Sequence, residues 1–594
     1  MSHSRKALIF AIAPIDRLAR DFEWTGLDLS KTILVPIGAG VDSIWDVSDV
    51  QVYNASVQIT RNRFDDISNQ VHQEWTRWST NRPHDSIRRY FSYVFHITRT
   101  PVLHWRMSVT LALERFKPTE VYLYGASDET INGISNRNEF LRWARGAIVS
   151  EAFPDVVKVK VSAEPRVGLL SRAKGIRMDM LLDFLWFIRV TPPKLMRILR
   201  ARMRRCCSFG KASNGAGSPR VIVIAQGLKS TALLTFLSSR GVTFRTVNVP
   251  EIVTNTSNNH FKRVLAIEDC PLSEIVDSTF YSLLDMFVDE LRSNRKALID
   301  FAHEPWQVLM TDHEHDAHVR FLADEAAECG KFVVLIPEGV QTLANPDVRP
   351  YYGNWFFDTP RVMRFAVSEQ EVDHYTQTFS AEQVIRSGYL GRSEWPQSAT
   401  FPALTPVAGF LLRKHRNSRR MALINFDDMG PLGLGRAGSQ DLYSEILSLE
   451  RLIEELTALG WAICVTTKSG GPLKYLRSKF AGLPVWYFTY LDWQILAEAS
   501  DVVVQRDSSL GPESLNLNLP VIVWNECRLP LASSECIQSS NGMMILVESV
   551  KDLGGALARA LQKNEQSNKS KGLTRTPSID NLNRWLDSLP KWQA

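Results

Sequence analysis

The sequence has few cysteines and none of the spacings that cysteine-based sites require. Seven cysteines are scattered over 594 residues, only Cys206 and Cys207 are adjacent, and no Cys-x-x-Cys occurs. This argues against a disulfide framework and against a zinc ribbon. Scattered cysteines are typical of a reducing compartment, so we expect the protein in the cytoplasm.

Long apolar runs are also absent. No window of 18 consecutive apolar residues exists, so no membrane-spanning helix is expected. The N-terminus has a basic start, but the apolar run at 7–12 is too short for a signal peptide. A first buried strand that ends in a loop at Pro14 explains this apolar run better.

The composition, with 44% hydrophobic and 22% charged residues, is that of a globular protein. The net charge of +5 is unevenly distributed, because residues 166–211 carry twelve Lys and Arg against only Asp179 and Asp183. The rest of the chain is mildly acidic. A local basic patch on such a protein is not typical of a nucleic-acid binder, and no nucleic acid is expected as a partner.

Strand-like and helical stretches alternate along most of the chain, which predicts the α/β fold class. The rhythm indicates an N-terminal α/β domain at 1–165 and a basic amphipathic segment with a Ser/Gly/Asn-rich linker at 166–219. Two Rossmann-like domains follow at 220–415 and 416–594, the second with a C-terminal tail. The first 165 residues are either an additional Rossmann-like module or an elaborated part of the domain at 220–415.

The basic segment allows two interpretations. Five of the six cations at 194–205 would crowd one side of a helix, with Leu, Ile and Met elsewhere on it: Lys194, Arg197, Arg200, Arg204 and Arg205. This is the composition of a helix that lies on an anionic membrane surface, and it predicts peripheral attachment of 166–211 at the inner face of the plasma membrane. A solvated helix packed against its own domain would have the same pattern.

Residues 499–525 hold the most informative pattern. A strand at 502–505 is followed by a polar break, the pair Ser508 and Ser509, a short helix from Leu510 and a second strand. Serine hydroxyls and free N–H groups at a helix start suit a phosphate. Glu513, one turn later, would face the same crevice and could bind sugar or ribose hydroxyls. The alternative is that the serines only cap the helix.

This pattern resembles the donor-binding domain of glycosyltransferases with the two-Rossmann GT-B fold, and of the related UDP-N-acetylglucosamine 2-epimerases. The matching positions are Asp501 with the following valines, Ser508-Ser509, the Glu513 helix and the Pro520 strand. The resemblance covers about residues 220–565. It implies that the domain at 416–594 binds a nucleotide sugar, that the domain at 220–415 binds the acceptor, and that a cleft separates them.

Two further loops and one flanking residue complete the expected donor site. Residues 427–438 contain four glycines that allow close backbone approach, and Arg436 could meet a diphosphate bidentately. A loop without ligand is the alternative. Lys468 matches the lysine of a Lys-Pro-His-Pro turn of surface-polysaccharide transferases, but Gly470 replaces its histidine. Arg506 adds a cation directly before the serine pair.

The middle domain supplies the expected catalytic groups. Residues 311–318 (TDHEHDAH) follow a predicted strand, and Asp312 and His313 are nearest to its end. Such residues could hold zinc or manganese. The resemblance favours a base or acceptor contact instead, because GT-B enzymes generally need no metal, and none is expected. Residues 333–339 resemble the strand and Gln-His-Gly turn of capsule and lipopolysaccharide transferases, with Glu338 in place of the histidine as a candidate general base.

These patterns predict a GT-B glycosyltransferase of bacterial surface polysaccharide (capsule or lipopolysaccharide) biosynthesis. It would move a sugar from a nucleotide sugar to a saccharide or lipid-linked saccharide and need no cofactor besides that donor. The alternatives are a sugar-nucleotide epimerase, or a catalytically silent GT-B-like scaffold that recruits partners to the membrane. The silent scaffold is suggested by the two histidines replaced by Glu338 and Gly470.

Overall fold

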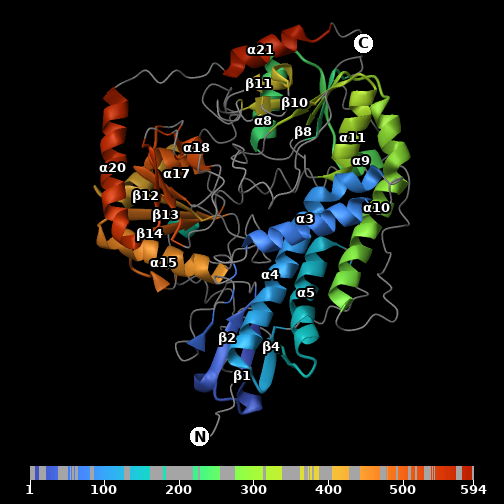
Figure 1. Ribbon diagram of the computed structural model, residues 1–594. Helices are drawn as coiled ribbons and strands as arrows, with labels where there is room; N and C mark the ends of the chain where they lie inside the picture. The colour runs from blue at the N-terminus through green and yellow to red at the C-terminus, as the bar shows by residue number, and fades with distance from the viewer. Residues whose placement is uncertain are drawn as a thin grey trace.

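The structure is a computed structural model of the whole chain (Figure 1). It describes residues 7–12, 22–37, 51–53, 55, 59, 64–80, 86–125, 134, 136–160, 178–181, 219–224, 228–253, 274–311, 316–336, 362–366, 372, 375–376, 380–386, 405–426, 442–467, 476–477, 479–489, 493–505, 510–515, 518–526, 537, 540, 542–569 and 578–590.

The first part of the chain forms its own parallel sheet, sheet A, with the strand order β3-β2-β1-β4-β5. This is the Rossmann order, which reverses between β1 and β4. The central strands are apolar runs without alternation because both faces of a parallel sheet are covered. The strands are β1 (Ala7–Ala11), β2 (Thr32–Pro36), β3 (Gln51–Val52), β4 (Glu120–Tyr124) and β5 (Val157–Val159).

Long helices cover one face of sheet A, where Leu8 and Phe10 pack in one cluster with Val109 and Ala144. At a rise of about 1.5 Å per residue, the 25-residue helix α4 is about 38 Å long, whereas the five-residue strand β4 that follows it spans about 17 Å. The helical elements here are η1 (Glu23–Thr25), η2 (Leu29–Lys31), α3 (Phe64–Thr80), η3 (Ser86–Phe91), α4 (Ser92–Phe116) and α5 (Arg137–Ala152).

The middle part forms a second parallel sheet, sheet B, with the order β11-β10-β9-β8-β6-β7, which reverses between β6 and β8. Its strands are β6 (Val221–Ile224), β7 (Phe244–Thr246), β8 (Val308–Thr311), β9 (Phe332–Leu335), β10 (Val362–Ala366) and β11 (Val384–Arg386). Its helical elements are α8 (Leu228–Ser239), α9 (Val249–Val253), α10 (Ile275–Ala302), α11 (Ala317–Glu328) and η7 (Ala381–Gln383).

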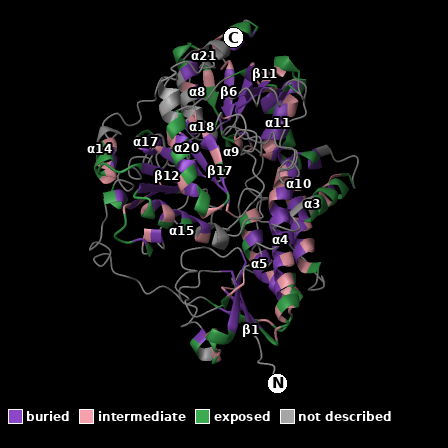
Figure 2. Ribbon diagram, turned by 60° about the vertical axis from the view of Figure 1, so that its left-hand side comes forward, coloured by how far each residue is buried: buried purple, intermediate pink, exposed green. Residues whose placement is uncertain are grey.

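Sheets A and B share one continuous hydrophobic core. The 28-residue helix α10 packs on α5 and α11, and Phe280 of α10 meets Phe95 of α4 edge-on with ring centroids 5.1 Å apart. The same cluster extends from Leu8 of sheet A to Val333 of sheet B. Figure 2 shows the inward sides of these helices as buried.

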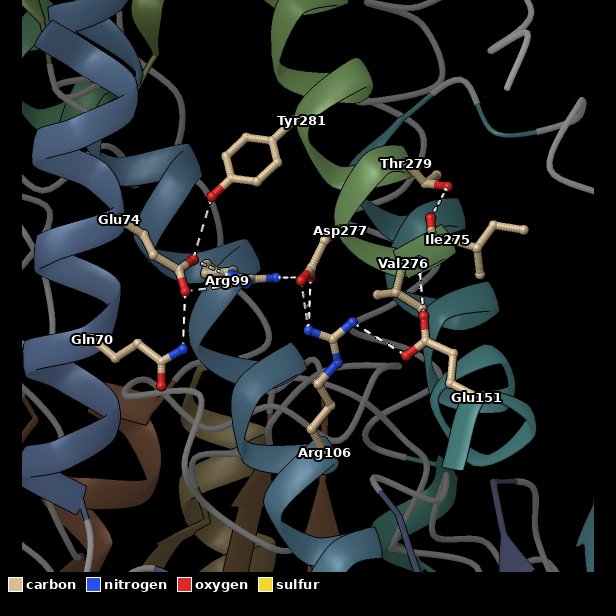
Figure 3. A network of polar contacts seen from close by, with 10 residues as sticks. All are labelled: Gln70, Glu74, Arg99, Arg106, Glu151, Ile275, Val276, Asp277, Thr279 and Tyr281. Atoms are coloured by element: carbon tan, nitrogen blue, oxygen red, sulfur yellow. Dashed lines mark hydrogen bonds and ion pairs between the residues drawn. The ribbon is translucent and has the colours of Figure 1, made fainter. Parts of the chain in front are cut away.

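A polar network joins the same helices (Figure 3). Arg99 of α4 donates to Glu74 of α3 (Nε to Oε2, 2.5 Å) and to Asp277 of α10. Arg106 Nη1 lies 2.8 Å from both oxygens of Asp277, and Arg106 also donates to Glu151 of α5. Two arginines on one helix therefore tie together segments from both sheets.

The last part forms the third parallel sheet, sheet C, with the order β14-β13-β12-β15-β16-β17. Strand β17 was not expected from the sequence. Its strands are β12 (Met421–Phe426), β13 (Ala462–Thr467), β14 (Val485–Phe488), β15 (Val502–Gln505), β16 (Val521–Trp524) and β17 (Met544–Val547). Its helices are α14 (Thr405–Arg416), α15 (Leu442–Ala458), α17 (Trp493–Ala499), α18 (Leu510–Leu515) and α20 (Val550–Lys569).

The last helix, α21 (Ser578–Ser588), belongs to sheet B and not to sheet C. Trp585, Leu586 and Leu589 are buried in one cluster with Phe365 and Ile385 of sheet B. Figure 1 shows α21 in red beside β10 and β11, apart from α20. The chain therefore leaves the middle part to build sheet C and then returns.

Candidate functional site

The carboxyl edge of sheet C contains a reversal of the strand order. Strands β12 and β15 are direct neighbours, with Asn425 opposite Gln505, and the strand order reverses between them. Connections on the two sides of such a reversal diverge, which leaves room for a ligand beyond the carboxyl ends of the strands. All six strands are parallel, so the segments that follow β12, β13 and β15 leave from the same edge.

The predicted donor-binding segments are the ones that leave this edge. Residues 427–438 follow β12, Lys468 follows β13, and residues 506–509 follow β15. The side chains of Arg436, Lys468, Arg506, Ser508 and Ser509 lie outside the described residues. What the structure brings together is therefore the set of strand ends from which these segments start.

Helix α18 begins at Leu510, where the sequence predicted it, and contains Glu513, whose side chain also lies outside the described part. The helix has six residues. It packs so tightly on the strand before it that a Cβ at Gly511 would lie 2.5 Å from Gln505 Nε2. Gln505 is itself buried, with 2% of its surface exposed. A glycine is needed here for close packing and not for an unusual backbone angle.

One residue of the recognised motif has a purely structural position. Asp501 Oδ1 accepts from Arg416 Nη2 at 2.8 Å, and Asp501 Oδ2 accepts from the backbone N–H of Met421 at 2.7 Å. These contacts lie where β12 and β15 begin, at the edge opposite the predicted donor segments. Asp501 thus anchors the end of α14 to the sheet.

The expected catalytic residues follow two neighbouring strands of sheet B. Strands β8 and β9 are paired with Thr311 opposite Leu335, and the Ile336 N–H donates to the Thr311 carbonyl at 2.8 Å. Asp312 and His313 come directly after β8, and Glu338 comes shortly after β9. All three lie outside the described residues, so the structure gives their starting points and not their side-chain positions.

A polar cluster at the start of α11 joins Asp316 and His318 of the 311–318 motif to residues of α10 that the sequence did not indicate. Asp316 caps this helix by accepting from the N–H groups of His318 (2.8 Å) and Val319 (3.2 Å). His318 Nε2 lies 3.3 Å from Asn294 Nδ2 and 3.8 Å from Glu290 Oε1, both on α10. No local pattern could predict this cluster, because half of it comes from a helix that precedes the strand.

The two carboxylates of this cluster differ in proton affinity. Burial raises the pKa of Glu290, and His318 only partly offsets this effect. For Asp316, burial also acts upward, but the hydrogen bonds from His318 and the helix N–H groups prevail and lower its pKa. The helix cap is therefore held as an anion, while Glu290 keeps its proton to a higher pH than an ordinary glutamate.

Within the described ranges, no three His, Cys, Asp or Glu side chains are grouped closely enough to hold a metal ion. In the same part of the chain, no helix combines the length and the apolar character that crossing a bilayer demands. Of the basic segment, residues 178–181 are described, and Lys194 and Arg205 lie outside.

No family model and no curated protein sequence matches the chain. Solved structures with some likeness include UDP-GlcNAc 2-epimerase from Methanocaldococcus jannaschii, at 14% identity over 62% of this chain and 99% of that one, with a TM-score of 0.40. UDP-GlcNAc 2-epimerase from Neisseria meningitidis bound to UDP-GlcNAc has 12% identity over 62% and 98%, also with a TM-score of 0.40. The calicheamicin glycosyltransferase CalG4 has 13% identity over 63% and 100%, with a TM-score of 0.37. At these values the likeness assigns neither a family nor an activity to this chain.

Proposed function

We propose that the protein is a nucleotide-sugar-dependent glycosyltransferase of GT-B arrangement, with the donor on sheet C and the acceptor on sheet B. The observation that carries this proposal is the reversal of strand order between β12 and β15. The segments that resemble donor-binding motifs start from the strands at this reversal and from the strand beside it.

The donor's diphosphate would be held mainly by cations and loop N–H groups. Helix α18 has only six residues, so its dipole is small compared with that of a long helix. Lys468, Arg436 and Arg506 would therefore supply most of the positive charge, and Ser508 and Ser509 would donate hydrogen bonds. Glu513 would accept from ribose or sugar hydroxyls.

Transfer requires a base for the acceptor hydroxyl and stabilisation of the departing diphosphate. Asp312, His313 and Glu338 are the candidates for the base, since they follow adjacent strands of sheet B. The Glu290–His318 contact lies at the start of α11, directly after residues 312–315 in the sequence. The basic segment 166–211 suggests a lipid-linked saccharide acceptor in surface polysaccharide synthesis, bound at an anionic membrane surface.

The test is ligand-induced thermal stabilisation with UDP-, GDP-, CMP- and CDP-sugars, because a ligand that binds only the folded state raises Tm. Lys468→Ala and Glu513→Ala should each abolish the shift produced by the donor that binds. Lys551→Ala and Glu498→Ala are the matched controls on exposed positions of α20 and α17, and they should leave the shift unchanged.

The competing functions give different results in the same assay series. An epimerase would convert the bound UDP-sugar with no acceptor present. A silent scaffold would bind none of the nucleotide sugars but would bind anionic liposomes firmly. Normal donor binding by both site variants would contradict the proposed donor site.

A further inference from the structure

Two helix ends meet at the amino edge of sheet B, opposite the edge that carries the proposed chemistry. Helix α10 is followed by His303 and helix α11 by Cys329. The neighbouring strands β8 and β9 begin shortly afterwards, at Val308 and Phe332. His303 and Cys329 are both exposed to solvent.

The hydrogen bonds of His303 orient its ring towards the thiol. Nδ1 lies 2.8 Å from the Ile299 carbonyl oxygen, which can only accept, so Nδ1 carries the proton. Nε2 is then an acceptor, and it lies 3.6 Å from Cys329 Sγ. The thiol therefore donates to a ring nitrogen that is ready to take its proton.

Charged groups lie on both sides of the pair. Glu325 lies one helical turn before Cys329. Burial raises the pKa of Glu325, and a positive charge on His303 would lower it, because the Glu325 carboxylate and a protonated His303 attract each other. Lys331 lies two residues after Cys329, with its ammonium 3.6 Å from the centre of the Trp306 ring and donating to the Glu304 carbonyl. Burial lowers the pKa of Lys331 to about 8, while a negative charge on Cys329 would raise it.

We propose that Cys329 is a modification site, a nucleophilic thiol that His303 activates for exchange with small disulfides. The thiol proton moves to His303 Nε2 as the sulfur attacks one sulfur of the disulfide R–S–S–R. The S–S bond breaks, a new bond forms between Cys329 Sγ and one S–R group, and the other leaves as a thiolate. That thiolate takes the proton from the imidazolium and departs as R–SH, so no further oxidant is needed.

The charges around the pair are of both signs. Glu325 and Glu328 lie on the last turns of α11 and repel each other. Lys331 interacts with the thiol, Arg295 offsets part of the negative charge at Glu325, and Arg245 lies 3.4 Å from Glu304. These charges offset one another, so no preference for a disulfide of one charge is expected.

The experiment treats the folded full-length protein with cystamine and follows each of its seven cysteines by peptide mass spectrometry. Cys329 should be modified, while Cys464, which is fully buried, should stay free in the folded protein. His303→Gln should slow modification of Cys329 about tenfold or more. A base in a closed active site typically accelerates a reaction by about a hundredfold or more, and the exposed His303 should contribute less than that. His72→Gln, a change of an exposed histidine on α3, should have no effect.

A second readout separates activation from a structural role. Added imidazole should restore part of the rate in His303→Ala, because a diffusible base can occupy the vacated space. An unchanged rate in His303→Gln, or no restoration by imidazole, would overturn the proposal. Neither result depends on nucleotide-sugar binding, so this inference and the proposed transferase activity fail independently.

Discussion

The Asp179 carboxylate accepts a hydrogen bond from the backbone N–H of Tyr487 (Oδ2 to N, 3.0 Å), although the two residues are 308 positions apart. Tyr487 lies in β14, the edge strand of sheet C, and Asp179 is completely buried. Edge strands present unpaired N–H groups that proteins must cover. Here a residue from the predicted basic segment does so.

Asp179→Ala should therefore loosen this edge. A buried N–H without an acceptor costs about 1–3 kcal/mol, so the Tyr487 amide should exchange its hydrogen about tenfold faster or more. Hydrogen-exchange mass spectrometry or NMR measures this directly. Asp179→Asn keeps an accepting oxygen and should change exchange much less. Equal exchange in wild type and Asp179→Ala would show that this contact does not protect the strand.

Arg99→Met should destabilise the junction between sheets A and B. The Arg99 side chain is 3% exposed and pairs with Glu74 and Asp277, so its removal leaves two carboxylates partly uncompensated (Figure 3). Loss of one partner from a buried ion pair costs about 3 kcal/mol or more. Arg292→Met is the control, because Arg292 forms an exposed pair with Asp289 on the same α10 and should contribute less than about 1 kcal/mol. Urea unfolding of the three proteins decides the outcome.

Two buried histidines should make the protein sensitive to mild acid. Burial lowers the pKa of both His96 and His104 to about 4, from an ordinary value of 6.5. Between these values the unfolded chain binds protons at both residues and the folded chain does not, so stability rises with pH. The stability that the two neutral imidazoles preserve is fully present above about pH 6.5 and is lost as pH falls towards 4.

His104→Leu should remove part of this dependence. At pH 5 each histidine should cost about 2 kcal/mol of unfolding free energy relative to pH 7.5, so the variant should lose less stability over this interval than wild type. The urea midpoints of wild type and variant at pH 5 and pH 7.5 measure this difference. Between pH 7.5 and 8.5 both imidazoles are neutral in either state, and wild type and variant should then change alike.

Gly511→Ala should disturb the predicted donor site through packing. The new methyl group would lie 2.5 Å from Gln505 Nε2 and 3.1 Å from Met544 Cε, and buried Gln505 has little room to turn away. We expect a loss of about 1–3 kcal/mol in stability and weaker nucleotide-sugar binding. Gly555→Ala on α20 meets no atom closer than 3.6 Å and should instead stabilise its helix by about 0.5–1 kcal/mol. Thermal denaturation with and without donor compares the two variants.

The sequence predicted most strands because buried parallel strands are short apolar runs bounded by polar residues. Strand β15 begins and ends at the residues that the pattern indicated, 502–505. The start of α18 was predicted for the same reason, since the polar break after β15 ends at Leu510. Strand β17 was missed.

Contacts between distant segments could not be predicted, since they leave no trace in local patterns. Arg99 and Asp277 are 178 positions apart, and neither helix face shows which partner it will meet. The Glu290–His318 contact and the return of α21 to sheet B are of the same kind. For the candidate site, the predicted strand ends indicated the edge of each sheet from which the loops start. The roles of the loop side chains remain predictions.

The return of α21 also has a consequence for biosynthesis. Trp585, Leu586 and Leu589 complete the apolar layer over Phe365 and Ile385, yet about 200 residues separate these groups along the chain. At about 5–20 residues per second, a ribosome needs some 10–40 s to traverse that interval. Throughout this time the nascent middle sheet would expose an uncovered apolar surface, which makes it a binding site for chaperones until residue 589 has emerged.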